Sequence, residues 1–158
     1  MSRIPVLVVA ALLGACGFHL QGDLTTPSEM ERTYIAPYER NSQFHRELRR
    51  QLDAAGVHVV DSENDATAMI VITADDTGQR VLSVSARNVP TEYEVFYTIE
   101  YSLVSGEDIL LPPQDITFVR DYTWDETLVL GKAHEEELMR EALVRDLVRT
   151  VLKQFSTL

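Results

Sequence analysis

Residues 93–104 carry the clearest alternation of apolar and polar positions in the chain. One face has Tyr93, Val95, Tyr97, Ile99, Tyr101 and Leu103, and the other includes Glu94, Thr98, Glu100 and Ser102. Successive side chains of a strand point to opposite faces, so this alternation predicts a half-buried strand. Apolar or alternating runs predict further strands over residues 32–37, 57–60, 68–74, 79–86 and 116–123.

Two other segments have the period of an amphipathic helix. In residues 134–155 the apolar stripe consists of Leu138, Ala142, Leu143, Leu147, Val148, Val151, Leu152 and Phe155. Glutamates at 135–137 fill its first turn, where the helix dipole favours anions. An earlier helix follows Ser42, a good N-cap, and ends at Gly56. Its apolar positions are Phe44, Leu48, Leu52 and Ala55.

These elements predict one α+β domain over residues 30–158. A chain of 158 residues with 45% hydrophobic content suits one core, because a chain of this size can bury roughly two-thirds of its unfolded surface. A turn at residues 105–108 joins two of the predicted strands into an antiparallel meander. We therefore expect a two-layer sandwich, with two α-helices packed on one face of an antiparallel or mixed β-sheet.

The N-terminus has the layout of a secretory signal. Arg3 precedes an apolar run over residues 4–13, which is too short to span a bilayer. The sequence Leu-Gly-Ala-Cys then ends at Cys16 and matches the lipobox, in which a peptidase cuts before the cysteine and its thiol carries diacylglycerol. The alternative is an ordinary buried cysteine in an apolar helix. That alternative leaves the basic start and the small residues before the cysteine as coincidences.

The lipobox divides the N-terminal region into a signal peptide, residues 1–15, and a lipidated tether, residues 16–29. Acyl chains on Cys16 anchor the protein firmly, since each buried methylene contributes roughly 0.8 kcal/mol and several chains act together. Gly17 rather than aspartate follows the cysteine, which by the common Gram-negative sorting rule favours the outer membrane. Cys16 is the only cysteine, so no intramolecular disulfide stabilises the fold.

The mature chain is strongly acidic. Removal of residues 1–15 takes away Arg3 and leaves 13 basic against 25 acidic residues, a formal charge of −12. Such a field excludes nucleic acid as a partner. An anionic ligand would need basic side chains placed locally against the field. Arg87 and Lys132 are the candidates in predicted loops, although each taken alone can also be ordinary solvated charge.

The sequence offers no arrangement of residues that predicts catalysis or metal binding. The only thiol is used for lipid, and no serine lies in a nucleophile-elbow context. The histidines, His19, His45, His58 and His134, are scattered without ligand spacing. Asp75 and Asp76 are adjacent, and we expect them in a solvated turn. We therefore expect a protein that is not an enzyme and that uses no metal and no cofactor.

A mainly apolar loop precedes the last predicted helix. Its large apolar side chains are Trp124, Leu128, Val129 and Leu130. Two interpretations stay open. These residues either cover an open end of the core between helix and sheet, or contact another protein.

Several segments together resemble the LptE family of LPS-assembly lipoproteins. They are residues 16–20 (CGFHL), residues 43–57 (QFHRELRRQLDAAGV), Ala86-Arg87-Asn88 followed by Thr91-Glu92-Tyr93, and Gly131-Lys132 before the acidic start of the last helix. The resemblance covers nearly the whole mature chain in order. Gln21 departs from the family pattern, because a basic residue often stands there, and the extended polar C-terminal tail of some members is missing.

The resemblance implies a lipid-anchored subunit of the outer membrane that faces the periplasm. Members of the family sit as a plug inside the barrel of the LPS-assembly protein LptD, one copy of each, and assist delivery of lipopolysaccharide to the cell surface. It also implies that Arg87 and Lys132 bind lipopolysaccharide. In that setting Trp124 and residues 128–130 are expected to contact the barrel. The alternative is an adaptor lipoprotein of another envelope complex without lipopolysaccharide binding, and an exported hydrolase is a remote third.

Overall fold

A computed structural model describes residues 26–123 and 129–158, and for residues 129–133 it describes the backbone alone. The strands are β1 (Arg32–Ala36), β2 (His58–Val60), β3 (Ala68–Val84), β4 (Pro90–Ser105) and β5 (Asp108–Thr123). The α-helices in this part of the chain are α2 (Gln43–Ala54) and α3 (Val129–Phe155), and 3-10 turns lie at η1 (Ser28–Glu31) and η2 (Glu63–Asp65).

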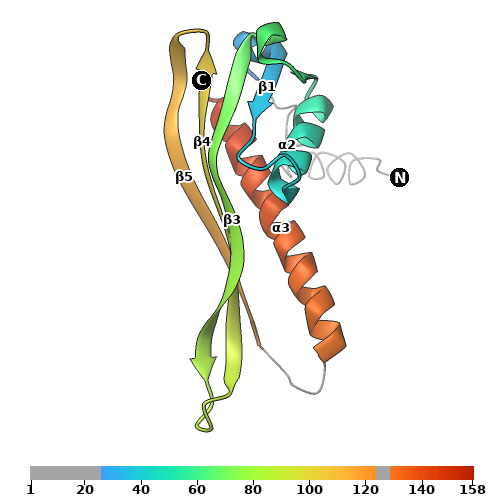
Figure 1. Cartoon of the computed structure of the whole chain (residues 1–158), viewed down its shortest axis with the longest axis vertical. Coiled ribbons are helices and arrows are strands. Elements are labelled where there is room, and N and C mark those ends of the chain that lie inside the picture. The colour runs from blue at the N-terminus through green and yellow to red at the C-terminus, as the bar shows by residue number, and fades with distance from the viewer. Residues whose placement is uncertain (1–25, 124–128) are drawn as a thin grey trace, which may run out of the picture.

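The described strands form one mixed sheet in the order β2-β1-β3-β4-β5. β1 is parallel to both β2 and β3, whereas β3, β4 and β5 form an antiparallel meander. Figure 1 shows α2 and α3 side by side on the same face of the sheet. The predicted two-layer α+β sandwich is therefore confirmed.

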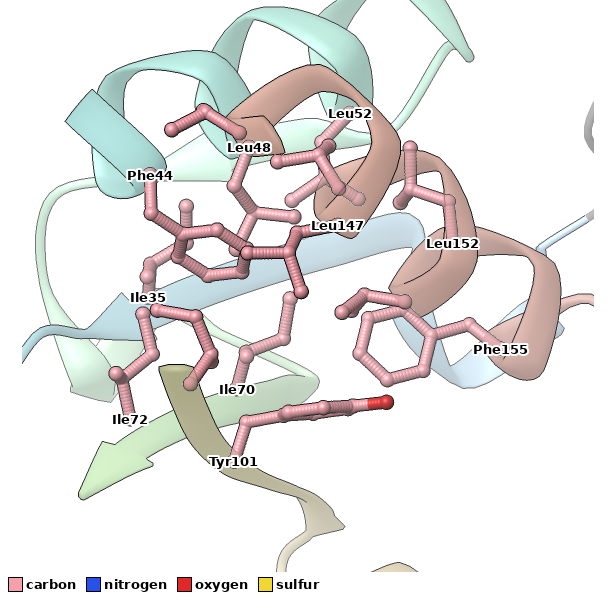
Figure 2. Close-up of a cluster of buried hydrophobic side chains, with 14 of the residues drawn as sticks. Ile35, Phe44, Leu48, Leu52, Ile70, Ile72, Tyr101, Leu147, Leu152 and Phe155 are labelled. Carbon is pink, nitrogen blue, oxygen red and sulfur yellow. The ribbon is translucent and has the colours of Figure 1, made fainter. Parts of the chain in front are cut away.

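The core lies between the two helices and the sheet. α2 supplies Phe44, Leu48 and Leu52, α3 supplies Leu147, Leu152 and Phe155, and the strands supply Ile35, Ile70, Ile72 and Tyr101 (Figure 2). The face of β4 that the alternation selects, from Val95 to Leu103, is buried under the helices. Full burial of one such side chain stabilises the fold by roughly 1.5–3 kcal/mol. The alternation thus indicates correctly which face of β4 meets the core.

The ends of α2 follow the predicted signals. The Ser42 hydroxyl accepts a hydrogen bond from the His45 backbone N–H at 3.0 Å, which satisfies one donor of the first turn. Gly56, with φ at +84°, follows the end of the helix in the left-handed conformation that glycine adopts without strain.

β3 corrects the prediction of two separate strands over residues 68–74 and 79–86. It is continuous from Ala68 to Val84, because β4 pairs with it along its length, with register shifts at Ile72/Ala74, Val81/Ser83 and Ser83/Val84. Asp75 and Asp76 therefore lie inside a strand and not in a turn. The buried Tyr97 hydroxyl donates to Asp75 Oδ1 at 2.8 Å, and this bond allows an acidic side chain on the helix-facing side of the sheet.

Three other boundaries and positions differ from the prediction. β5 begins at Asp108 rather than residue 116, and it contains Pro112 and Pro113, because an edge strand tolerates residues that lack an N–H donor. α3 begins at Val129 rather than His134. Leu138 is half exposed, although it shares the predicted apolar stripe. Neither described helix is long and apolar enough to cross a membrane.

Candidate functional site

Arg87 lies in the turn that joins β3 to β4. The Ser85 N–H donates to the Val89 carbonyl at 2.8 Å, and the Asn88 N–H donates to the Ser85 carbonyl at 2.9 Å. Asn88 has φ at +61°, a left-handed conformation that asparagine tolerates better than most residues. The turn is thus closed by its own hydrogen bonds, and Arg87 is exposed at its tip.

The fold brings this turn and the start of α3 to the same end of the molecule. β5 ends at Thr123, which pairs with Glu92 near the beginning of β4, and α3 begins six positions later at Val129. Figure 1 shows both the hairpin turn and the first turns of α3 toward the end opposite the C-terminus, with the start of α3 to one side of the hairpin. The backbone of Lys132 lies in the first turn of α3, and its side chain is outside the described part.

The other predicted site residues lie mostly outside the described residues. Cys16, Trp124 and Leu128 fall in undescribed segments. Val129 and Leu130 are the first residues of α3, and only their backbone is described. For these residues both interpretations, covering the core and contacting a partner, therefore stay predictions.

Exposed apolar side chains precede Arg87 on the last part of β3. Val81, Leu82 and Val84 are each about half exposed, at 49%, 46% and 51% of their surface. Val81 still pairs with Tyr93, but Leu82 lies in a register shift between Val81 and Ser83, where the regular alternation of strand faces is interrupted. The sequence gives only one sign of this exposure, which is that apolar residues occur on both parities of a strand predicted to be half-buried.

Polar contacts across the hairpin hold this end of the sheet in place. Ser83 Oγ lies 2.8 Å from both Thr91 Oγ1 and Glu92 Oε2. Arg80 pairs with Glu94, which is 8% exposed, and its guanidinium lies 5.9 Å from the centre of the Phe96 ring. These contacts favour a rigid hairpin next to the exposed side chains of Val81, Leu82 and Val84.

A second polar group lies at the N-terminus of α2 and is structural in character. The Tyr97 hydroxyl accepts from the Phe44 N–H at 3.4 Å while it donates to Asp75. Burial first, and then the bond to Asp75, raise the pKa of Tyr97 above its usual range. Within the described residues, no group of three or more His, Cys, Asp and Glu side chains is placed to hold a metal ion.

His45, beside this group, makes stability depend on pH. Burial, followed by the nearby Arg49 and Arg40, lowers the pKa of His45 below its ordinary value of 6.5. Folding therefore disfavours protonation of His45, so the stability that its neutral form contributes is complete above pH 6.5 and is lost as the pH falls through the lower folded pKa. We expect the unfolding free energy of the mature chain to decrease between pH 7 and 5.5, and His45→Gln to reduce that decrease in urea titrations. An equal decrease in the variant would assign it to other groups.

The fold is a small two-layer α+β domain that is similar to solved lipoprotein structures. A solution structure of lipoprotein B from Nitrosomonas europaea matches at a TM-score of 0.74 with 28% identity, over 89% of this chain and 90% of that one. Rare lipoprotein B from Shewanella oneidensis has the same fold, with a TM-score of 0.69 and 22% identity over 80% of this chain and 94% of that one.

Sequence comparison identifies the family. The model of the LptE lipopolysaccharide-assembly family matches residues 30–155, and the chain belongs to that family. The LPS-assembly lipoprotein LptE of Yersinia pestis strain Pestoides F is 24% identical over 157 residues, 98% of this chain and 72% of the relative. The predicted family is thus confirmed, and its name describes lipopolysaccharide assembly rather than a catalysed reaction.

Proposed function

We propose that this protein is a lipid-anchored outer-membrane subunit that plugs an LptD-type β-barrel, one copy of each, and binds lipopolysaccharide directly during assembly at the cell surface. Membership of the lipopolysaccharide-assembly family supports the general role. The observation that supports direct binding is the position of the Arg87 turn and the start of α3 at one end of the molecule (Figure 1). Arg87 and Lys132 can act on one ligand only if their segments lie near each other.

The chemistry of this end suits an anionic amphiphile. Lipid A carries phosphates and acyl chains, and Arg87 has a planar guanidinium that can donate two hydrogen bonds to one phosphate. Lys132 adds a point charge in the first turn of a helix, where free backbone N–H groups also favour anions. The exposed Val81, Leu82 and Val84 offer apolar surface beside the cation. No turnover and no cofactor is required for this role.

The N-terminal region supplies the anchor in this proposal. Residues 1–15 are removed as a signal peptide, Cys16 carries the acyl chains, and residues 16–29 join the lipid to the domain. The chain then faces the periplasm and reaches into the partner barrel. The apolar segment that precedes and begins α3 is the expected contact with the barrel, and its residues are Trp124, Leu128, Val129 and Leu130.

Recovery of the barrel with the tagged mature protein tests the plug role. We expect a one-to-one complex with a large β-barrel protein from detergent-solubilised envelopes. A photocrosslinking amino acid at position 124 or 128 should trap the barrel, whereas the same probe at Lys153, exposed near the C-terminus, should not. A stable complex with a different envelope protein would instead identify the chain as an adaptor lipoprotein.

A further inference from the structure

β3 has an open edge along most of its length. β1 pairs with it only from Ala68 to Val71, whereas β4 pairs with it from Met69 to Val84. From residue 72 to 84, β3 therefore has one neighbouring strand within the described part of the chain. One row of main-chain N–H and C=O groups along residues 72–84 faces no strand, which makes it a template for another chain in extended conformation.

The other two edges of the sheet are protected in ways that this edge is not. β2 has three residues, which is too short to hold a partner strand firmly. β5 is long but contains Pro112 and Pro113, which cannot donate to an added strand. Residues 72–84 contain no proline, and their last part exposes Val81, Leu82 and Val84, next to two register shifts in the pairing with β4. A long open edge that ends in exposed apolar side chains is normally covered in the working assembly.

We propose that an extended segment of the β-barrel partner adds to residues 72–84 of β3 as a further strand, an inference that rests on the proposed function. A second copy is disfavoured because each mature chain carries a formal charge of −12. A closed barrel wall has no free edge, so the added strand comes from a loop or a terminal segment of the partner and not from its wall.

The side chains along the edge specify the chemistry of the added strand. Asp76 is exposed in the first half of the open edge, and no Lys or Arg of the described residues forms an ion pair with it. Val81, Leu82 and Val84 lie in its last part. The partner segment accordingly carries a basic side chain near Asp76 and β-branched or aromatic side chains near Val81 and Val84, since such cross-strand pairs stabilise a sheet.

Amide hydrogen exchange on the full complex of lipoprotein and barrel tests this pairing. We expect amides within residues 72–84 to exchange more slowly in the complex than in the mature lipoprotein alone, while those of the β5 edge do not change. Protection of β5 alone, or of neither edge, in a complex that forms normally overturns the inference and leaves the proposed function intact. Failure to form any complex overturns both. Slow exchange that appears in the lipoprotein alone as its concentration rises, together with a dimer in solution, would assign the edge to a second copy.

A pair of lysine substitutions provides an independent readout. Leu82→Lys with Val84→Lys places charges on the open edge, a device by which natural edges avoid pairing, and should lower barrel recovery about tenfold. The matched control is Ile109→Lys with Val119→Lys, which changes two exposed apolar residues of β5 at 67% and 46% exposure. Both pairs should keep the melting temperature of the parent. Equal recovery of the barrel by the two pairs would overturn the inference.

Discussion

Replacement of Cys16 by alanine is expected to abolish acylation and to release the protein from the outer membrane. The thiol is the only one in the chain and is the proposed attachment point for diacylglycerol. Several acyl chains give near-permanent anchoring, because one chain alone is marginal and each buried methylene contributes roughly 0.8 kcal/mol. Labelling with a palmitate analogue and membrane fractionation measure both effects. The domain should stay folded, since its core begins at Met30, well after the anchor.

A neighbouring substitution separates acylation from sorting. Gly17→Asp leaves the lipobox cysteine in place and should keep the label, but by the sorting rule it should hold the protein in the inner membrane. Cys16→Ala should lose the label in every fraction. Label that persists in Cys16→Ala would contradict the lipobox interpretation, and outer-membrane recovery of Gly17→Asp would contradict the sorting rule for this chain.

The double charge reversal Arg87→Asp with Lys132→Asp is expected to weaken lipopolysaccharide binding by tenfold or more. A hydrogen bond to a charged group contributes roughly 1.5–3 kcal/mol, and about 1.4 kcal/mol corresponds to a factor of ten. Stability should not fall, because Arg87 is exposed and an aspartate in the first turn of α3 suits the helix dipole. Binding of purified lipopolysaccharide and thermal unfolding, measured on the same samples, check both statements.

The matched control reverses two exposed basic residues at the other end of the molecule. Arg32 begins β1 and Lys153 lies in the last turn of α3, so Arg32→Asp with Lys153→Asp makes the same change in net charge away from the hairpin turn (Figure 1). If both pairs weaken binding equally, the effect is the general field of the acidic chain. If neither does, Arg87 and Lys132 are ordinary solvated charge, and the search moves to Val81, Leu82 and Val84.

Local patterns in the sequence predict correctly the elements whose buried face is set by side-chain period. The alternation from Tyr93 to Leu103 identifies the buried face of β4, and Ser42 and Gly56 identify the ends of α2. These succeed because one strand face or one helical stripe meets the core, and because caps depend on residues next to the helix. The lipobox at Cys16 is also a local signal, and the acylation that it indicates stays a prediction.

The tertiary structure alone decides what depends on distant segments. β3 continues through Asp75 because β4 pairs alongside it and Tyr97 supplies a hydrogen bond, neither of which neighbouring residues reveal. The parallel pairing of β1 with β3 stops at Val71 and so creates the open edge. Arg87 and the start of α3 come to one end because β5 returns along β4 before α3 begins. Side-chain period predicts which face of a strand is buried, but which strands become neighbours depends on contacts between residues far apart in the chain.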